Sequence, residues 1–483
     1  MDTAKPTRIS PATISPPTIS PLDPAATTPF YRQIYDRFRD AIASGVLKPG
    51  DRIPSARALT QELGLARGTI EAAYSLLAAE GYIQARGQAG TIVTPDLKPR
   101  MPVIPPRPPS DSGLASTSFR PDSILPFQMG LPALDAFPRK VWARLGARCV
   151  RAIQPSSMAH PAIYGLPALR SQIAAYLRVS RGINCAPSQV FVTSGYRHTI
   201  ELIAHALLKA GDRVWLENPG YPPTRELFGY MQIAGVAVPV DQDGMIVSDG
   251  IKLAPRALAA VVTPAHQSPL CVSLSLPRRL ALLDWARRNK AWIIEDDYDG
   301  EYRYVSRPLP ALKSLDREDR VLYAGTFSKV LFPSLRLAYL VAPEPQIERF
   351  EEISQAFAGS SPELTQTIVT TFIREGHFAR HIQRMRKLYA ERRDATAAGL
   401  ESVLGQHMEV GSPPGGMHLI LRLRGRQSDR RLVARMGEVG LYGEALSDWM
   451  MDRHKASALL LNFTNIDSRK TAENLGKRIL KLL

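Results

Sequence analysis

Apolar residues recur every three or four positions from residue 30 onward, a spacing that predicts amphipathic helices. Phe30, Ile34, Phe38 and Ile42 share one face of the first predicted helix, which Gly45 ends. Two shorter helices follow, and Gly64 breaks the first of them before the second begins near residue 66.

The two short helices are the size and spacing of a helix-turn-helix, whose second helix enters the major groove of DNA. Ser55 can cap the first helix, and Ile70 and Leu77 lie on the inner face of the second. The segment YIQARGQAGTIV, residues 82–93, then predicts two short strands around a glycine-rich hairpin, as in a wing. An ordinary helical hairpin without DNA fits the helical pattern about as well.

Composition divides the chain into four segments. Residues 1–28 are rich in Pro, Ser, Thr and Ala without apolar periodicity, which predicts a flexible arm. Residues 29–94 contain the helices and the hairpin, and the proline-dense residues 95–126 predict an extended linker. Residues 127–483 remain for a second, larger domain.

The second domain alternates apolar runs with amphipathic helical stretches, which predicts a doubly wound, mainly parallel sheet. In such a sheet, ligands bind at the carboxyl ends of the strands. The apolar runs are residues 190–193, 213–216, 259–262, 291–294 and 321–324, and helical stretches include 171–179 and 278–289.

Lys329 lies in a stretch that is otherwise apolar, because Val321–Ala324 precede it and Val330–Phe332 follow it. A buried lysine loses its proton readily, and a neutral amine can form a Schiff base with an aldehyde. A lone lysine of this kind is more often exposed on a turn. Its flanking side chains, Thr326, Ser328 and Arg336, favour chemistry, since hydroxyls and a guanidinium hold phosphate.

Other polar residues follow the ends of other predicted strands. Gly195 opens a helix whose free N–H groups can bind phosphate, and Tyr221 and the acidic run Glu295–Asp299 follow two further strands. Taken singly, each of these residues has an ordinary structural interpretation. The acidic run also fits a metal-binding turn, although no nearby histidine or second carboxylate set completes a metal shell. Together they match the needs of pyridoxal phosphate, which are an amine, a carboxylate, an aromatic face and phosphate donors.

The charge balance indicates an anionic partner. The 483 residues carry a formal net charge of +16 with a pI near 9.8, but residues 1–94 hold only ten Lys and Arg against eight Asp and Glu. Two basic runs, residues 380–393 and 422–431, are interpreted first as solvated faces, with DNA contact as the alternative. Three widely spaced cysteines favour neither a disulfide framework nor a zinc site.

Residues 29–93 resemble the winged helix-turn-helix of GntR-type regulators through the motifs PSxRxL, LGxxRxT, AYxxLxAEGY and GxxGTxV. The resemblance implies double-stranded DNA as a partner. It places DNA contacts on Arg57, Arg67 and Thr69, and wing contacts on Gln88 and Gly90.

Residues 127–483 resemble the fold-type I aminotransferase domain, and the whole chain resembles the MocR/GabR-like subfamily of GntR regulators. The motifs are YG...LR, TSG, ENPGYP, TPxHQ, IIEDDYDGEYRY and GTFSKxLxPxLRLxY. The expected fold class is therefore α/β, with an N-terminal winged helix-turn-helix and a C-terminal aminotransferase-like domain that depends on pyridoxal phosphate. The resemblance also implies a head-to-tail homodimer that reads paired DNA half-sites.

The resemblance gives each site residue an expected role. Lys329 is the expected Schiff-base lysine, and Asp296 the partner of the pyridine nitrogen. Tyr221 is expected to stack on the ring, and Tyr298, with His266 or Gln267, to hydrogen-bond the ring hydroxyl. The residues expected at the phosphate are Gly195, Tyr196, Thr326, Ser328 and Arg336, with Tyr164 as a candidate from the partner subunit.

Three positions depart from the family's pattern. Cys271 replaces a glycine in the segment HQSPLC, and Tyr196 stands where many relatives have a small or amide residue. The late strand that carries a carboxylate-clamping arginine in the family reads Leu459–Phe463 and has no arginine there. An amino-acid effector would then need Arg225 or another cation.

These features predict a transcriptional regulator that senses a small amine, an amino acid or pyridoxal phosphate itself through an internal aldimine at Lys329. The alternative is an aminotransferase with an accessory DNA-binding domain, and the missing clamp favours at most weak turnover. The sequence has neither a run of about 18 apolar residues nor a basic-then-apolar leader, so we expect a cytoplasmic protein without membrane contact.

Overall fold

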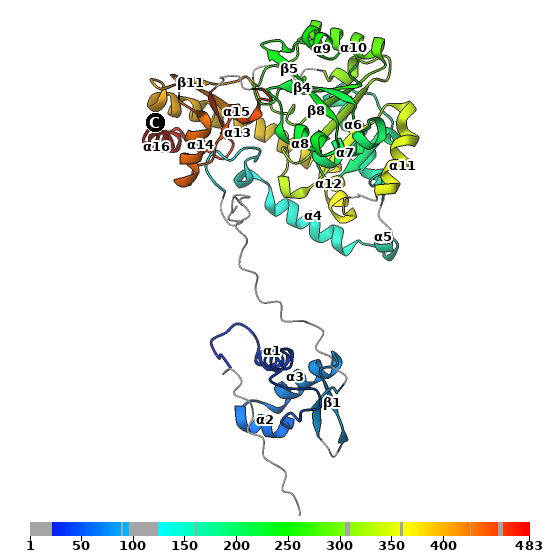
Figure 1. Cartoon of the computed structure of the whole chain (residues 1–483), viewed down its shortest axis with the longest axis vertical. Coiled ribbons are helices and arrows are strands. Elements are labelled where there is room, and N and C mark those ends of the chain that lie inside the picture. Colours follow the sequence, from blue (N-terminus) through cyan, green and yellow to red (C-terminus); the bar gives the residue numbers. More distant parts are fainter. Residues whose placement is uncertain are drawn as a thin grey trace, which may run out of the picture. The chain divides into compact units, whose positions relative to one another are not determined.

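The computed structural model describes residues 22–87, 90–95, 124–159, 162–304, 310–357, 361–425, 427–452 and 457–483. The chain divides into two compact units, Met1–Phe119 and Arg120–Leu483, which are drawn in Figure 1. No helix within the described ranges is both long enough and apolar enough to cross a membrane.

The first unit is a three-helix bundle with a small antiparallel hairpin. Ser55 Oγ accepts from the Ala58 N–H and so caps the second helix, and Gly64 ends that helix with a φ of 64°. Ile34, Phe38 and Leu77 pack in its core. The elements are α1 (Phe30–Ala43), α2 (Ala56–Leu63), α3 (Arg67–Ala79), β1 (Ile83–Ala85) and β2 (Thr91–Val93).

The second unit is built on an eight-stranded sheet with the order β3-β10-β9-β8-β7-β4-β5-β6. The inner strands β9, β8, β7, β4 and β5 run parallel, whereas β10 is antiparallel to both of its neighbours. The expected parallel core is therefore present, with antiparallel strands toward its edges. The strands are β3 (Val190–Thr193), β4 (Arg213–Asn218), β5 (Ala234–Asp241), β6 (Gly244–Met245), β7 (Ala259–Val262), β8 (Trp292–Asp297), β9 (Val321–Thr326) and β10 (Ala338–Val341).

Helices follow most of these strands, as the alternating pattern predicted. The helices of this part are α4 (Arg139–Arg151), α5 (Pro155–Ala159), α6 (Pro167–Ser180), α7 (Tyr196–Leu207), α8 (Pro222–Tyr230), α9 (Val247–Leu253), α10 (Leu276–Asn289), α11 (Ile347–Phe357) and α12 (Glu363–Arg374).

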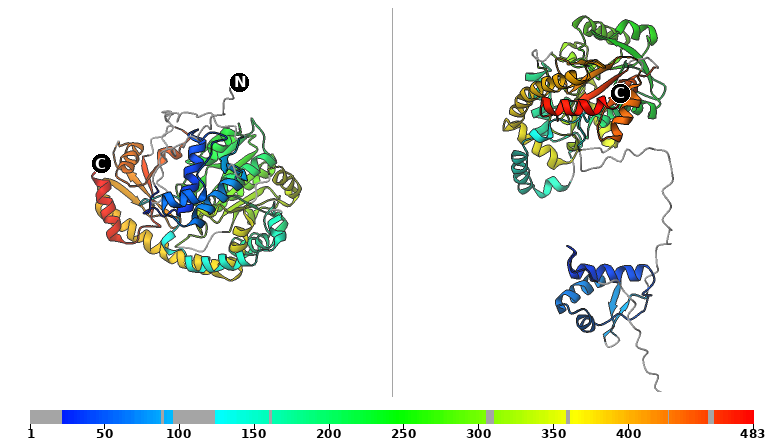
Figure 2. Two further views of the ribbon diagram at one scale, coloured as in Figure 1. Left: turned by 90° about the horizontal axis from the view of Figure 1, so that it is seen from below. Right: turned by 90° about the vertical axis from the view of Figure 1, so that its left-hand side faces the viewer.

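A second, four-stranded antiparallel sheet with the order β11-β12-β14-β13 ends the chain. Figure 2 shows α16, in red, beside the long helix α13, and both pack on this smaller sheet through Leu400, Leu419 and Ile479. The elements are α13 (His377–Leu404), β11 (Met408–Gly411), β12 (His418–Leu423), α14 (Asp429–Glu438), β13 (Glu444–Ala445), α15 (Leu446–Trp449), β14 (Ala458–Asn462) and α16 (Arg469–Leu480).

The basic run at residues 380–393 lies within α13 and is partly used inside the unit. Arg386 donates to the Glu301 carbonyl at 2.6 Å, and the guanidinium of Arg392, which is 8% exposed, pairs with Asp135. His381 and Tyr389 on the same helix are buried. This run is therefore a helix with one packed face, while Arg380, Arg384 and Lys387 remain exposed.

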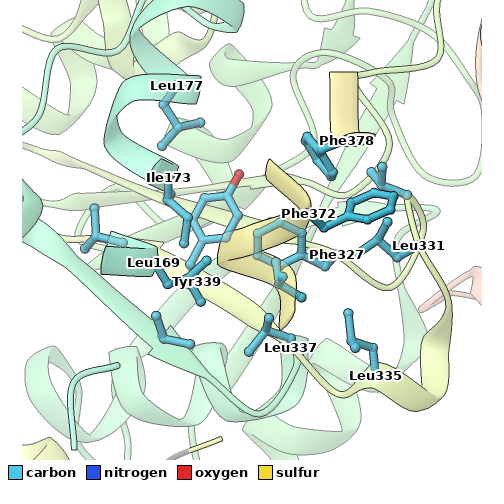
Figure 3. Close-up of a cluster of buried hydrophobic side chains, with 14 of the residues drawn as sticks. Leu169, Ile173, Leu177, Phe327, Leu331, Leu335, Leu337, Tyr339, Phe372 and Phe378 are labelled. Carbon is cyan, nitrogen blue, oxygen red and sulfur yellow. The ribbon is translucent and has the colours of Figure 1, made fainter. Parts of the chain in front are cut away.

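The loop after β9 is anchored by its own apolar residues. Figure 3 shows Phe327, Leu331 and Leu335 packed in a core cluster with side chains from α6 and α12. Since these residues point into the core, the polar residues between them turn the other way. The loop thereby presents Ser328 and Lys329 on its opposite side.

Candidate functional site

A cavity of about 290 Å³ lies where β8 and β9 end, beside the start of α7. This edge is the one at which ligands of parallel sheets bind. Its lining includes all but three of the residues expected around a cofactor. Those lining residues are Gly195, Tyr196, Tyr221, Asp296, Tyr298, Thr326, Ser328, Lys329 and Arg336.

Lys329 faces the cavity. Its Nζ donates to the Gly130 carbonyl oxygen at 3.1 Å, and a Cβ on Gly130 would come within 2.6 Å of that Nζ. Burial lowers the pKa of Lys329 below its ordinary value, although Asp299, Glu444 and Asp296 oppose the shift. The amine is thus more readily neutral than that of a surface lysine.

The consecutive acidic residues of β8 separate because neighbouring residues of a strand point to opposite faces. Asp297 turns into the core, where it pairs with the buried Arg181, and Glu295 accepts from the backbone N–H groups of Leu312 and Lys313 at 2.7 and 2.8 Å. Asp296 instead lines the cavity.

Asp296 is 6% exposed and forms no ion pair with any described residue. Burial raises its pKa well above the ordinary value, and the carboxylates of Asp297, Glu217 and Asp299 raise it further. A buried carboxylate in this state favours a cationic partner inside the cavity.

Aromatic side chains stand beside Asp296. The Tyr196 ring meets the Tyr221 ring edge to face at 5.6 Å, and Tyr221 is tilted against Trp449 at 5.7 Å. The Tyr196 hydroxyl is hydrogen-bonded to Thr224 Oγ1 at 2.7 Å. A phosphate contact from Tyr196 would therefore come from its backbone N–H at the start of α7.

Two hydroxyl residues and a guanidinium lie along the loop after β9. Thr326 Oγ1 accepts from the Ser328 N–H at 3.1 Å, and Arg336 adopts a left-handed φ of 50°. Gly195 has a φ of 117°, which favours glycine, and a Cβ there would be in van der Waals contact with Arg336 Cζ at 3.4 Å. Arg336 forms no ion pair within the described ranges, which leaves its guanidinium available to an anion.

Three expected site residues do not line the cavity. The Gln267 amide is occupied by Glu217 and by the Pro219 and Ser268 carbonyls, and His266 Nδ1 lies 3.2 Å from Asp299 and 3.3 Å from the Tyr298 hydroxyl. Tyr164 is hydrogen-bonded to Gln355 of α11. Gln267 and His266 therefore sit behind the lining, and the idea that Tyr164 acts across a dimer stays a prediction.

The cysteine that departs from the family's pattern lies behind the cavity as well. Cys271 has a φ of 61° and is 4% exposed, and its Sγ is 3.4 Å from His418 Nε2. Although burial acts in the opposite direction, His418 and His266 lower the pKa of the Cys271 thiol to about 6. His418 itself donates to the Pro269 carbonyl at 2.8 Å.

Several lining residues were not predicted. The predicted residues Thr326, Ser328, Lys329 and Arg336 belong to one motif that begins at the end of β9, and we call them the loop wall. A second wall comes from the smaller sheet and α15, and we call it the small-sheet wall: Met417, His418, Glu444 and Trp449. The remaining unpredicted residues are Met129, Gly130, Arg197, Ser268, Asp299 and Pro333. Of these, Asp299 and Pro333 had a signal, because Asp299 belongs to the acidic run at the end of β8 and Pro333 is a fixed position of the motif GTFSKxLxPxLRLxY.

The first unit exposes the residues expected to meet DNA. Arg57 and Arg67 are exposed, Thr69 is partly exposed, and Arg67 Nε is paired with Glu71 at 2.7 Å. Gly90 has a φ of 84° and lies against the Arg52 guanidinium. Gln88 lies outside the described residues.

Comparison with known proteins recovers both units. Residues 30–93 match the family of bacterial regulatory proteins called gntR, and residues 130–454 match aminotransferase class I and II. The three solved structures that follow are aminotransferases.

An archaeal alanine:glyoxylate aminotransferase is 27% identical with a TM-score of 0.69, and it covers 74% of this chain and 90% of its own. The kynurenine aminotransferase of Pyrococcus horikoshii is 26% identical with a TM-score of 0.67, over 74% and 91% of the two chains. The α-aminoadipate aminotransferase LysN of Thermus thermophilus is also 26% identical, with a TM-score of 0.68 over 74% and 92%.

Relatives that match nearly the whole chain are regulators. The probable rhizopine catabolism regulatory protein MocR of Rhizobium meliloti is 35% identical over 94% of both chains. The pyridoxine biosynthesis regulator PdxR of Corynebacterium glutamicum is 33% identical over 92% of this chain and 94% of its own. The chain therefore belongs to the MocR-type branch of the GntR family of transcriptional regulators, in which a DNA-binding helix-turn-helix is joined to a domain of the pyridoxal-phosphate-dependent aminotransferase class I and II fold.

Proposed function

We propose that this regulator holds pyridoxal phosphate in the cavity and senses a small amine, an amino acid or the cofactor itself there. One observation carries the proposal: Lys329, Asp296 and Arg336 line a single cavity in a chain that also carries a DNA-binding unit. An amine, a carboxylate without a cationic partner and an available guanidinium are what the cofactor's aldehyde, ring nitrogen and phosphate require.

The residues present fit the cofactor. The glycines Gly130 and Gly195 leave room that any larger side chain would fill beside Lys329 and Arg336. The buried Asp296 carboxylate gains a cation if it meets a protonated ring nitrogen, which offsets the cost of its burial. Tyr221 and Tyr196 supply aromatic faces, and Tyr298 an additional hydroxyl.

When bound, the cofactor supplies an aldehyde that forms a covalent bond with an amine. Lys329 would hold it through the neutral amine that burial favours. Asp296 would keep the ring nitrogen protonated, while Thr326, Ser328 and Arg336 would bind the phosphate. If an amine effector took the place of the lysine, Nζ would be free to take up a proton and to bind elsewhere in the cavity.

The signal must reach the DNA through two arrangements of the protein that bind the ligand unequally. We place the arm at residues 1–28, the DNA-binding domain at 29–94, the linker at 95–126 and the sensing domain at 127–483. In a head-to-tail homodimer, Tyr164 would reach the partner's cavity. Arg57, Arg67, Thr69, Gln88 and Gly90 would contact paired half-sites.

The test is DNA binding by the same protein in three states: free of cofactor, loaded with pyridoxal phosphate, and loaded with added amines. The duplexes are selected from a random library by the free and loaded proteins in parallel. The proposal expects affinity or footprint to differ by about fivefold or more between at least two of the states. Identical binding in all three would overturn it.

A matched variant separates the two units in this test. Arg67→Ala is expected to weaken DNA binding by about tenfold while cofactor loading stays as in the wild type. If Arg67→Ala also abolished cofactor loading, the DNA defect would reflect misfolding instead of a lost contact.

A second candidate function is that of an aminotransferase with an accessory DNA-binding domain, favoured by the likeness of this cavity's domain to the aminotransferases above. The loaded protein would be incubated with amino donors and keto acids. Turnover above about one per second, the lower end for ordinary enzymes, would support this function.

A further inference from the structure

The small-sheet wall carries one acidic side chain in a fixed position. Glu444 of β13 accepts from the Tyr442 hydroxyl through Oε1 and from Trp449 Nε1 through Oε2, both at 3.0 Å. Two neutral donors hold the carboxylate without neutralising it. The wall therefore presents a negative charge to the cavity that Lys329 enters from the loop wall.

The small-sheet wall offers no Lys or Arg against this charge. Directly opposite Glu444 in the strand register stands Leu460, which is fully buried with Ile420, Leu446 and Trp449. Its histidine, His418, is turned to Cys271 and the Pro269 carbonyl. Within the described ranges, Glu444 forms no ion pair.

Arg225, the cation considered for an amino-acid effector, is engaged elsewhere. Its guanidinium donates to the Met450 carbonyl at 3.0 Å and to the Asp448 carbonyl at 3.4 Å. It lines a neighbouring cavity of about 30 Å³, which shares Tyr196, Tyr221 and Asp296 with the larger one, but it is not in the lining of the larger one. A carboxylate on the effector thus finds Glu444 and no Lys or Arg on the small-sheet wall. Arg197, which lines the cavity elsewhere, is already paired with Glu226 at 3.3 Å.

A second acidic side chain borders the same cavity. Asp299 lines it and is 2% exposed, and its Oδ2 is taken by His266 at 3.2 Å. Its Oδ1 is buried and has no hydrogen-bond partner in the part of the chain that the structure describes. An unpartnered acceptor of this kind favours a donor supplied by a ligand.

We propose that the effector is a small amine with a second positive charge, a diamine in the simplest case, and that Glu444 binds the second charge. The inference rests on the proposed function, since the first amine takes the place of Lys329 on the cofactor. A charge-assisted hydrogen bond to Glu444 would stabilise the second ammonium group, whereas a carboxylate on the effector would be repelled by Glu444. Asp299 and Glu444 both act to raise the pKa of Lys329, which means that each of them stabilises a positive charge in this cavity.

Three probes of equal chain length test the inference on cofactor-loaded wild-type protein: putrescine, n-butylamine and γ-aminobutyrate. Each is titrated while the visible absorbance of the bound cofactor is recorded, after unbound cofactor has been removed. We expect putrescine to half-saturate at a concentration lower than that of n-butylamine by about tenfold or more, with γ-aminobutyrate weakest. Equal or tighter binding of γ-aminobutyrate would overturn the inference.

Variants identify the residue responsible. Glu444→Gln should reduce the advantage of putrescine over n-butylamine to about twofold or less, because it removes the charge while keeping the shape. Glu438→Gln, an exposed position at the end of α14, is the matched control and should keep the advantage. A Glu444→Gln protein that still loads cofactor and keeps the full preference would contradict the assignment.

DNA binding distinguishes this inference from the proposed function. If putrescine is preferred but no ligand changes DNA binding, the cavity is selective and the sensing function fails. If amines change DNA binding without the preference for putrescine, the sensing function stands and the role of Glu444 fails.

Discussion

The two walls of the cavity are built in different ways. The loop wall comes from one continuous segment after β9, and its polar residues alternate with Phe327, Leu331 and Leu335, which anchor it in the core. The small-sheet wall is assembled from β12, β13 and α15, which reach the cavity only through the packing of a second sheet. One wall offers hydroxyls and cations, and the other offers a carboxylate and apolar surface.

This difference suggests a division of labour. A short, anchored motif is suited to hold a constant group, because its geometry depends on few other parts of the chain. The small-sheet wall can change its residues without disturbing that motif. We therefore expect changes in the loop wall and on β8 to alter cofactor binding, and changes in the small-sheet wall to alter the choice of amine.

The largest effect is expected from Lys329→Ala, which removes the amine on which both walls converge. Loading with pyridoxal phosphate should no longer produce the visible absorbance band of the lysine-bound cofactor, because no other loop-wall residue can replace the amine. Lys252→Ala, on an exposed face of α9, should keep the band. Persistence of the band in Lys329→Ala would remove that residue from its role.

The next largest effect is expected from Asp296→Asn, which should weaken cofactor binding without destabilising the cofactor-free protein. The loaded protein loses the carboxylate partner of the ring nitrogen, so cofactor affinity should fall by about 100-fold. In the cofactor-free protein, burial raises the pKa of Asp296, so ionisation of this carboxyl group destabilises the folded state as the pH rises. The asparagine variant does not have this cost, so its melting temperature at pH 8 should not fall below that of the wild type. Calorimetry of both states checks this, and equal destabilisation of both would contradict it.

A smaller effect is expected from Arg336→Lys, which keeps the charge of the loop wall but removes the planar fork. Cofactor affinity should fall by about tenfold, because a lysine cannot bind phosphate in the bidentate manner of arginine. The order of preference among amines should not change. A change in that order would break the proposed division between the walls.

The smallest effect is a pH shift in Glu444→Gln. Glu444 raises the pKa of Lys329 against the lowering by burial, so its loss should lower that pKa further. The neutral amine then persists to lower pH, and the pH midpoint for the rate of cofactor capture by the cofactor-free protein should move to lower pH. Stopped-flow absorbance across a pH series measures it, and a move to higher pH would contradict the sign.

The loop wall could be predicted from sequence because its information is local. Thr326, Ser328, Lys329 and Arg336 lie within one motif, and the apolar spacing around them already indicates which residues point inward. Strands β3 and β7 were predicted with their observed bounds for the same reason. The helix-turn-helix is likewise local, and its family is confirmed.

The small-sheet wall could not be predicted, because nothing near Glu444 marks it as a cavity residue. Its position depends on pairing of β13 with β14, and the loop-wall residues that share the cavity with it lie more than a hundred positions away in the chain. Gln267 is the opposite case, a residue that a motif marks but that does not line the cavity. Its motif indicated a ligand contact, but a neighbouring buried acid, Glu217, takes its amide.

Coupling between the cavity and the DNA-binding unit is tested directly by linkage between ligand binding and DNA binding. Coupling is reciprocal, so a ligand that changes DNA affinity by some factor must have its own affinity changed by the same factor when DNA is bound. The measurement is a putrescine titration of cofactor-loaded protein, followed by visible absorbance, with and without a saturating selected duplex. We predict that the two half-saturation concentrations differ by the factor seen in DNA affinity, whereas identical values would contradict the coupling.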